Sequence, residues 1–337
     1  MLRLIKYVFR MVKHLFLLIF YRKKTSLLFL TDLAKKLNSH YLFEFFISYY
    51  ARNINIGFLS GKKIFFGTGH GEGAIRNYRV IENEEKIFEK IVFKDSVDYQ
   101  KLIMYREFLQ DLLRINNILA PRIVNFKGYK FIALFYFEYI DGLGEDKIDN
   151  DNEYLNCLKK VLQKLVLVND YLSSMKMQII YKKEFDLLEG QVLREGVFRI
   201  QNISFFLDKK CKSSRIDMLI KRINDMSLVF SHGDLSINNF NSNGYVWDWD
   251  RAGYYPAGYD MVWSVVTYFS SRISIFEMYQ ISMKTAQSIY NDNDKDIDST
   301  NSKDIAMLLL VCYARKNHNI LNEKELINFF NSYVGDL

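Results

Sequence analysis

The first clear pattern of polar and apolar positions lies at the start of the chain. Apolar side chains between residues 2 and 16 fill one side of a helical projection, which predicts a basic amphipathic helix. The basic side chains that fall in an arc of roughly 100° on the other side are Arg3, Lys6, Arg10, Lys13 and His14. Two interpretations stay open: a helix lying in the plane of a membrane with its cations at lipid head groups, or a helix packed on the protein with a solvated basic edge.

That segment is predicted neither to span a membrane nor to be a cleaved signal peptide. The uncharged run 15–21 is far shorter than the roughly twenty apolar residues that a spanning helix needs. No small-residue cleavage site follows it.

Residues 31–55 continue the helical pattern, and from Lys62 the pattern changes to short β-prone runs. Three strands are expected, at 62–66, 74–81 and 86–93, joined by the glycine-rich stretch 67–73 and a turn at 82–85. Helical periodicity returns from Tyr99 to about Ile118 and ends at Ala120-Pro121. The continuous apolar run 131–140 is typical of a buried strand.

The rest of the chain is predicted to be mainly helical. The expected helices span 152–175, 183–207, 214–226, 261–269, 275–290, 303–316 and 323–334. There is no internal repeat and no long Pro/Gly/Ser linker. We therefore expect an α+β protein with a helical extension at 1–56, a small antiparallel-sheet domain at 57–142 and a mainly helical domain at 143–337.

Composition narrows the class of protein only a little. With 337 residues, 49% hydrophobic and 25% charged, the chain can build a real core and is not a disordered protein. The net charge of +7 permits an anionic partner such as a nucleotide, an acidic glycan or a lipid surface, and no nucleic-acid partner is expected. Cys157, Cys211 and Cys312 are far apart, which predicts a reduced, cytoplasmic protein without a zinc site or disulfide framework.

The stretch with the most chemistry is 231–250, which reads SHGDLSINNFNSNGYVWDWD. It lies between the β-prone runs 229–230 and 245–247 and contains a turn at 241–244, which predicts a catalytic loop followed by a hairpin. Phosphoryl transfer to a hydroxyl needs a carboxylate that accepts the proton and hard oxygen ligands for magnesium. Asp234 suits the first task, and Asn239 with Asp248 suits the second.

The same stretch resembles the catalytic segment of the aminoglycoside phosphotransferase and choline kinase superfamily, which has a protein-kinase-like fold of two lobes. The matching residues are His232, Gly233, Asp234, Leu235 and Asn239, then Trp247, Asp248, Trp249 and Asp250, followed by Gly253, Pro256 and Asp260. Trp247 stands where the family more often has an aliphatic residue. The resemblance implies that His232 supports the catalytic loop structurally rather than acting as the base, and that Asp250 assists the site indirectly.

The resemblance also implies a nucleotide site in the smaller domain. Its glycine-rich loop would cover the phosphates with Gly67, Gly69, Gly71 and Gly73, although the spacing is not the usual GxGxxG. Lys90 would contact the phosphates with Glu107 as its partner, and Lys94 is the competitor if the strand register differs. The backbone from Glu138 to Ile140 would hydrogen-bond an adenine edge.

The predicted function is therefore ATP- and magnesium-dependent phosphorylation of a hydroxyl on a small molecule or saccharide. A cell-envelope or capsular glycan precursor is favoured slightly as the acceptor, with peripheral membrane contact through residues 1–24 at the inner face of the cell membrane. A choline, amino-alcohol or aminoglycoside kinase is the alternative, and a cage drawn from Trp247, Trp249, Trp263 and Tyr254 or Tyr255 would serve a quaternary ammonium. A nucleotide-binding pseudokinase is a further alternative. A protein kinase is disfavoured because the HRD, DFG and APE motifs are missing.

Overall fold

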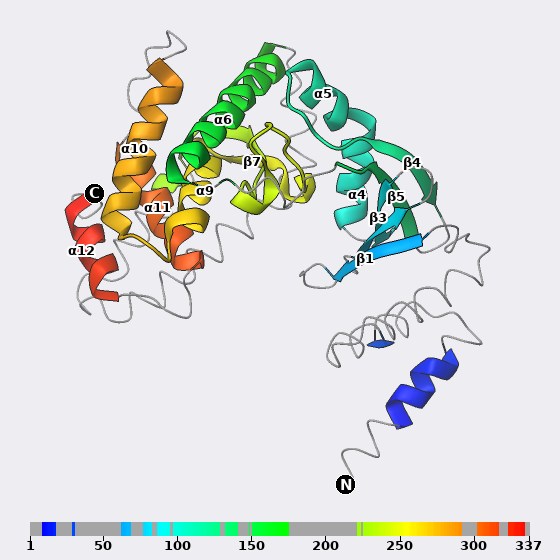
Figure 1. The fold of residues 1–337 in the computed structure, drawn as a ribbon. Coiled ribbons are helices and arrows are strands. Elements are labelled where there is room, and N and C mark those ends of the chain that lie inside the picture. The colour runs from blue at the N-terminus through cyan, green and yellow to red at the C-terminus, as the bar shows by residue number, and fades with distance from the viewer. Residues whose placement is uncertain are drawn as a thin grey trace. The chain divides into compact units, whose positions relative to one another are not determined.

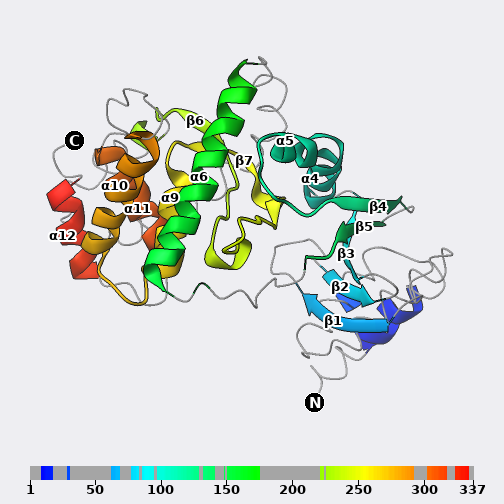
Figure 2. The ribbon, with the colours of Figure 1, turned by 45° about the horizontal axis from the view of Figure 1, so that its top comes forward.

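The computed structural model describes residues 9–17, 29–30, 62–68, 77–82, 86–94, 97–128, 132–140, 148, 150–174, 221–223, 225–291, 302–316 and 323–333. The chain divides into two compact units, and each is described by itself (Figures 1 and 2). The first unit comprises Met1–Gln110 and Pro121–Asp141, and the second comprises Asp111–Ala120 and Gly142–Leu337. None of the described helices combines the length and the apolar character needed to cross a membrane.

The first unit contains one antiparallel sheet of five strands. These are β1 (Lys62–Thr68), β2 (Asn77–Glu82), β3 (Lys86–Phe93), β4 (Ile123–Gly128) and β5 (Ile132–Glu138), in the spatial order β1-β2-β3-β5-β4. Each pair of neighbours runs antiparallel, so β5 lies between β3 and β4. The three strands expected before Phe93 and the strand expected near 131–140 are present, and β4 was not predicted.

A helical segment covers the face of this sheet that carries Phe135 and Phe137. It consists of α4 (Val97–Met104) and the π-helical turn η1 (Tyr105–Leu109). The chain continues into α5 (Gln110–Ile115), most of which belongs to the second unit, where the sequence predicted one uninterrupted helix. The ring of Tyr99 lies 6.1 Å from that of Phe135, and the ring of Tyr105 lies 6.2 Å from that of Phe137. The Tyr105 hydroxyl donates to the Pro121 carbonyl at 2.6 Å, so η1 is tied to the chain that enters β4.

The described part of the second unit is mainly helical. Its long helices are α6 (Asp151–Ser174), α9 (Tyr259–Phe269), α10 (Ile275–Asn291), α11 (Ser302–Lys316) and α12 (Glu323–Tyr333), close to the predicted bounds. Helices α9 and α11 are buried along most of their length, which fits apolar residues on all sides of each. The Tyr154 hydroxyl of α6 bonds to the Ser264 carbonyl of α9 at 2.9 Å, inside this core. The helix predicted at 183–207 and most of the one at 214–226 lie outside the described residues.

The second unit also has a two-stranded antiparallel sheet, β6 (Leu228–Ser231) with β7 (Gly253–Pro256). This differs from the expected hairpin, because Phe230 pairs with Tyr254 and not with the run 245–247. That run makes only isolated bridges, one of them between Phe240 and Val246. The segment 253–256, for which no strand was predicted, is a buried strand. Pairing β6 with β7 leaves residues 232–252 as a loop whose two ends meet.

The predicted fold class, α+β with a small antiparallel sheet and a mainly helical part, is confirmed by these two units.

Candidate active site

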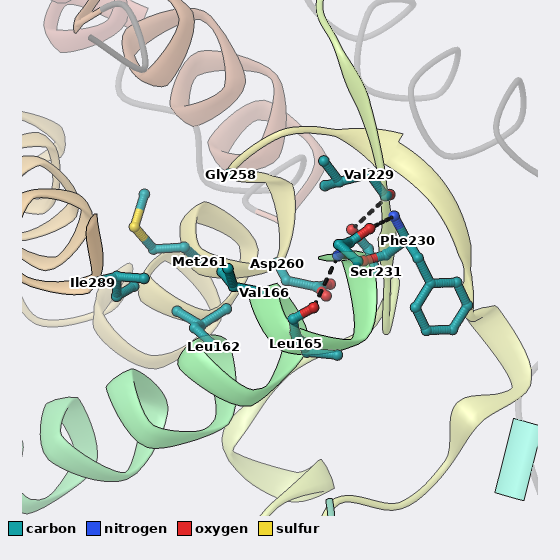
Figure 3. A pocket seen from close by; sticks show the side chains of 11 residues that line it. Leu162, Leu165, Val166, Val229, Phe230, Ser231, Gly258, Asp260, Met261 and Ile289 are labelled. Carbon is teal, nitrogen blue, oxygen red and sulfur yellow. Dashed lines mark hydrogen bonds between the residues drawn. The ribbon is translucent and has the colours of Figure 1, made fainter. Parts of the chain in front are cut away.

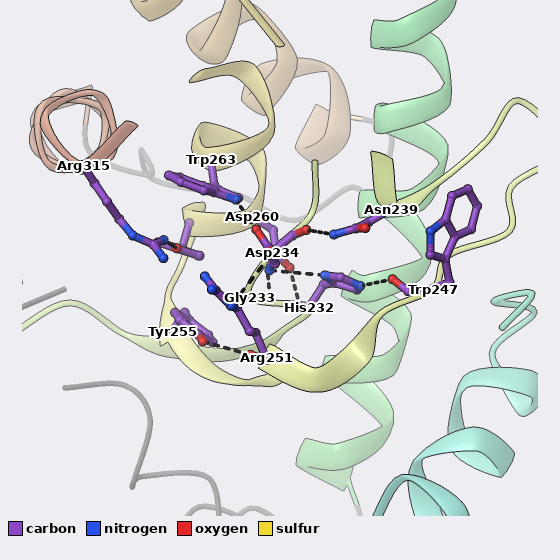
Figure 4. Close-up of polar contacts among 11 residues, drawn as sticks. His232, Gly233, Asp234, Asn239, Trp247, Arg251, Tyr255, Asp260, Trp263 and Arg315 are labelled. Atoms are coloured by element: carbon purple, nitrogen blue, oxygen red, sulfur yellow. Dashed lines mark hydrogen bonds and ion pairs between the residues drawn. The ribbon is translucent and has the colours of Figure 1, made fainter. Parts of the chain in front are cut away.

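The loop that follows β6 is anchored by a buried carboxylate of α9. The backbone N–H groups of His232 and Gly233 donate to the two oxygens of Asp260, at 2.6 and 2.9 Å (Figure 4). Asp260 is 4% exposed, and burial raises the pKa of its carboxyl, while the two backbone hydrogen bonds act in the opposite direction. The first turn of α9 therefore sets where the loop begins.

His232 is buried and uses both ring nitrogens on the backbone. The Asp234 N–H donates to its Nδ1 at 3.2 Å, so the proton resides on Nε2, which donates to the Trp247 carbonyl at 2.8 Å. The edge of the Trp249 ring lies against the imidazole, with centroids 4.6 Å apart. Because both ring nitrogens make hydrogen bonds to the backbone, His232 links the two halves of the loop. Neither nitrogen is left to act as a base.

Gly233 occupies a position that only glycine fits. Its φ of +78° lies in the left-handed region. A Cβ there would overlap the Arg251 carbonyl oxygen and come within 2.7 Å of the Tyr255 hydroxyl. The Tyr255 hydroxyl in turn donates to the Arg251 carbonyl at 2.9 Å, so this close approach of the two chain segments is held in place.

The carboxylate of Asp234 is held from two directions. Its Oδ1 accepts a hydrogen bond from the Trp263 indole N–H at 2.8 Å, and its Oδ2 lies 3.8 Å from Arg251 Nε (Figure 4). The second distance is an ion pair and exceeds a hydrogen bond. About a quarter of the Asp234 side chain, 26%, is exposed, so an acceptor can reach it. Behind Trp263, the Arg315 guanidinium lies 4.5 Å from the centre of the indole ring.

The backbone of Asn239 lies next to the backbone of the residue that precedes Asp248. The Trp247 N–H donates to the Asn239 carbonyl at 3.0 Å, and Asp248 is the next residue. The amide nitrogen of Asn239, in the short helix η2 (Ile237–Asn239), donates to the Asp234 carbonyl at 2.7 Å. That bond leaves Oδ1 of Asn239 as the atom that can bind a ligand.

Asp248 has the unusual left-handed backbone φ 60°, ψ 51° immediately before the short helix η3 (Trp249–Arg251). A non-glycine residue in this region costs free energy, and such residues gather at functional sites. Its side chain is exposed. Mg²⁺ is typically held by one or two protein oxygens together with substrate phosphates, so this pair fits the ion. The described residues contain no cluster of three or more His, Cys, Asp or Glu that would hold a metal without phosphates.

A small cavity of about 60 Å³ lies beneath the loop, between α6, β6 and α9 (Figure 3). Asn169 of α6 borders it and bonds to both backbone groups of Phe230: its Oδ1 accepts from the N–H at 2.7 Å, and its Nδ2 donates to the carbonyl at 2.9 Å. These two bonds occupy the edge of β6 that does not pair with β7. The cavity is far smaller than ligand pockets of about 300 Å³ or more, so it belongs to the support of the loop.

In the first unit, the structure does not bring Lys90 and Glu107 together. Lys90 is 9% exposed and lies on β3 opposite Phe135, on the face that α4 covers. Glu107 is exposed and lines a surface cavity of about 470 Å³ with Arg106, Gln110 and residues of β4. Because a π-helical turn holds more residues than an α-helical one, it rotates the following residues relative to the continuous helix that was assumed. The apolar face predicted to include Glu107 is formed instead by residues such as Tyr105 and Leu109.

The other candidate residues are only partly described. Gly67 lies in β1 and pairs with Tyr78 of β2. Glu138 ends β5, where its N–H donates to the Arg122 carbonyl at 2.8 Å, and Ile140 is buried. Gly69, Gly71, Gly73 and the side chain of Asp250 lie outside the described residues.

Sequence reasoning assigned no role in the site to Asp260, Arg251 and Asn169. It also did not identify Trp263 as a partner of Asp234. These four residues come from elements 17 to 61 residues away from the groups that they contact. One signal was available, since Asp260, immediately before the predicted helix 261–269, lies three residues from Trp263, a spacing that puts both on one face if the helix begins one residue earlier.

Comparison with known proteins found solved structures with a similar fold, but no similar family model or curated sequence. No protein-family model matches the chain, and no curated protein matches its sequence. Among solved structures, an amicoumacin kinase in complex with AMP-PNP, Ca²⁺ and its ligand is 13% identical over 80% of this chain and 88% of its own, with a TM-score of 0.51. An aminoglycoside-3'-phosphotransferase of type VIII is 16% identical over 78% and 97%, with a TM-score of 0.48. An aminoglycoside phosphotransferase from Streptomyces rimosus is 13% identical over 74% and 92%, with a TM-score of 0.42. The predicted resemblance to this group of kinases is confirmed at the level of the fold.

Proposed function

We propose that this protein is an ATP-dependent phosphotransferase that phosphorylates a hydroxyl group of a small molecule or saccharide. The observation that carries the proposal is the state of Asp234: a partly exposed carboxylate, oriented by an indole N–H, on a loop whose backbone is fixed by Asp260 and His232. Further along the same loop, Asn239 and Asp248 offer side-chain oxygens that would hold a metal. Sharing a fold with a kinase supports the proposal and does not by itself establish it.

Each of these residues has its own role in the proposed transfer. Asp234 accepts a hydrogen bond from the acceptor hydroxyl and takes its proton as the acceptor oxygen bonds to the γ-phosphorus of ATP and the bond to ADP breaks. Trp263 keeps Asp234 in one orientation through the transfer. Asn239 and Asp248 would hold Mg²⁺, which would neutralise charge on the nucleotide phosphates.

Nucleotide binding is assigned to residues of the first unit. Lys90, buried on β3, would bind a phosphate once ATP is present; the backbone at Glu138 to Ile140 would meet the adenine; and the loop around Gly67–Gly73 would cover the phosphates. That the amicoumacin kinase of the same fold was determined with AMP-PNP and Ca²⁺ is consistent with a nucleotide and a divalent ion here. Glu107 is not given a role, since it is exposed beside β4 and makes no ion pair with any described residue.

The described aromatic residues argue against a choline kinase. An aromatic cage needs exposed ring faces for the quaternary ammonium. Trp249 and Trp263 are only 6% and 7% exposed, and their N–H groups are bonded to Val246 and Asp234. A saccharide acceptor, such as a cell-envelope or capsular glycan precursor, is therefore the class that we favour.

The test is phosphate transfer by the purified full chain with MgATP, against sugars, amino alcohols, aminoglycosides and lipid-linked glycans. Asp234→Ala and Asp248→Ala should each abolish transfer while the protein stays folded. Asp151→Asn is the matched control, because Asp151 is an exposed carboxylate of the same unit that pairs with Arg272 on the surface. Activity retained by Asp248→Ala would remove the mechanism. Tight MgATP binding with no transfer to any acceptor or to water would instead indicate a pseudokinase.

A second proposal concerns peripheral membrane contact. Residues 9–17 are helical, and Phe9, Val12 and Phe16, at helical spacing, are 73%, 53% and 51% exposed. Arg10 and Lys13 on the same helix are exposed cations, the combination that binds an anionic lipid surface. Deleting residues 1–24 should release the protein from sedimenting phosphatidylserine vesicles; equal sedimentation of both forms would refute this proposal.

A further inference from the structure

We propose that the phosphate acceptor carries a negative charge, a carboxylate or a phosphate, and that Arg251 and Arg315 recognise it. A hydroxylated organic acid or a sugar phosphate is the chemical class that fits. The inference rests on the proposed function, since it concerns the molecule whose hydroxyl Asp234 would receive.

Arg251 presents an available guanidinium beside the proposed base. Its backbone is fixed, because the Tyr255 hydroxyl donates to its carbonyl at 2.9 Å. Its side chain is 31% exposed, and its contact with Asp234 is the 3.8 Å ion pair, too long for a hydrogen bond. Within the described residues, none accepts a hydrogen bond from its head group. A planar guanidinium carries five N–H donors in a fork that matches the oxygens of a carboxylate or phosphate, and in Arg251 they are open to a ligand.

Arg315 adds a second cation on the Trp263 side of Asp234. It lies in the last turn of α11, with its guanidinium 4.5 Å from the centre of the Trp263 ring and its Nη1 donating to the Tyr259 hydroxyl at 3.2 Å. Trp263 thus contacts Arg315 through its ring face and Asp234 through its N–H (Figure 4). Both arginines act to lower the pKa of Tyr255, which burial raises, so both charges are felt at one place.

Apart from Asp234, which pairs with Arg251, the described carboxylates near this site have other partners or roles. Asp260 is buried, and both of its oxygens accept backbone N–H groups. Asp248 is the proposed metal ligand. After Asp234 the loop continues with the uncharged residues Ser236, Ile237 and Asn238. An acceptor with a hydroxyl on Asp234 and an oxyanion on Arg251 would be attracted, whereas a polycationic acceptor would meet two like charges.

A different use of Arg251 would be to bind the phosphoryl group during its transfer. The two uses differ in what they require of the acceptor. An arginine that serves the phosphoryl group affects the nucleotide and every acceptor alike. An arginine that recognises the acceptor affects only anionic ones.

The experiment is calorimetric binding to the full chain saturated with Mg²⁺ and AMP-PNP. The probes share one ring: glucose is neutral, glucosamine is cationic, glucuronate bears a carboxylate and glucose 6-phosphate bears a phosphate. We expect at least one anionic probe to bind roughly tenfold or more tightly than glucose, and glucosamine to bind most weakly. Whichever of glucuronate and glucose 6-phosphate binds more tightly shows whether the acceptor carries a carboxylate or a phosphate.

Variants assign the effect to residues. Arg251→Gln and Arg315→Gln should each weaken the anionic probe about 5- to 20-fold, weaken glucose much less and leave AMP-PNP binding unchanged, and Arg251→Lys should restore part of the loss. Arg272→Gln is the control, because Arg272 is an exposed arginine of the same unit paired with Asp151.

The inference is overturned if the anionic probes bind no better than glucose, or do not bind to protein that binds AMP-PNP. It is also overturned if the arginine variants weaken AMP-PNP to the same extent as the probes. Neither result touches the proposed function, which fails instead if MgATP turnover is insensitive to Asp234→Ala.

Discussion

Replacing Trp263 by Phe removes one hydrogen bond from the proposed catalytic base and keeps most of the packing. The indole N–H donates to Asp234 Oδ1 at 2.8 Å, and the ring is only 7% exposed between Tyr259 and Arg315. A phenyl ring fills most of the same space and still presents a face to Arg315. The side chain of Asp234 would then be free to turn about its own bonds.

The structure sets the expected size of the effect. A hydrogen bond to a charged group contributes about 1.5 to 3 kcal/mol. At about 1.4 kcal/mol for each factor of ten in rate, losing the orientation of Asp234 should lower kcat roughly 10- to 150-fold. The KM for ATP should change little, because Trp263 contacts Asp234 and not a residue assigned to the nucleotide.

Two measurements check this prediction. Steady-state kinetics separate kcat from the KM for ATP, and a urea titration confirms that the variant is folded. The chain has three tryptophans, so ¹⁵N-labelled protein should give three indole N–H signals. Trp263→Phe assigns one of them, and Asp234→Asn should move that signal and leave the Trp249 signal, which reports the bond to the Val246 carbonyl, in place. A folded Trp263→Phe enzyme with unchanged kcat, or a loss confined to the KM for ATP, would refute the positioning role.

Three further outcomes follow, two from the same site and one from the core of the second unit. Asp260→Ala leaves two buried N–H donors without an acceptor at about 1 to 3 kcal/mol each, so urea unfolding should show a loss of about 2 to 6 kcal/mol; a change below 1 kcal/mol would contradict the anchoring role. Gly233→Ala should be less stable and inactive, because the new Cβ overlaps the Arg251 carbonyl, and a fully active protein would show that the loop adapts. Cys312 is 1% exposed, and burial raises the pKa of its thiol to about 12, so at pH 8 it is protonated and should resist iodoacetamide, as read by mass spectrometry, until the protein is unfolded and its pKa falls back towards 9.

Local sequence placed the proposed site residues within one stretch, because the chemistry requires particular groups at short spacing, and their roles stay predictions. Asp234, Asn239 and Asp248 were identified from one stretch, and the structure joins the backbones of Asn239 and Trp247 as a loop closure would. The helices of the second half were predicted close to their observed bounds, since their apolar periodicity is long and regular.

Strand pairing was the weaker part of the prediction. The runs 229–230 and 245–247 both have β propensity, and a short turn between them suggested a hairpin. The actual partner of β6 is β7, about 25 residues away in sequence, and its residues Gly253–Pro256 look like a turn when read alone. Pairing of this kind depends on burial against α6 and α9, which local propensity does not encode.

The expectation that Glu107 is the partner of Lys90 depended on helical phase. Its assignment assumed a continuous helix from Tyr99, and the π-helical turn Tyr105–Leu109 breaks that continuity. A shift in helical phase moves a side chain to another face, just as a shift of strand register does. Nothing in the local composition signals such a turn, so the partner of Lys90 could not be chosen from the sequence.

The two hydrogen bonds between the Asn169 side chain and the Phe230 backbone limit which residues can replace Asn169. The strand backbone presents one donor and one acceptor, and the side chain opposite must offer the complement at the same spacing. Aspartate would supply two acceptors and face a carbonyl oxygen with one of them; leucine, of similar branched shape, would supply neither group. A residue on a helix far away in the sequence is therefore expected to vary as little as the loop 232–252, because it completes the strand that leads into that loop.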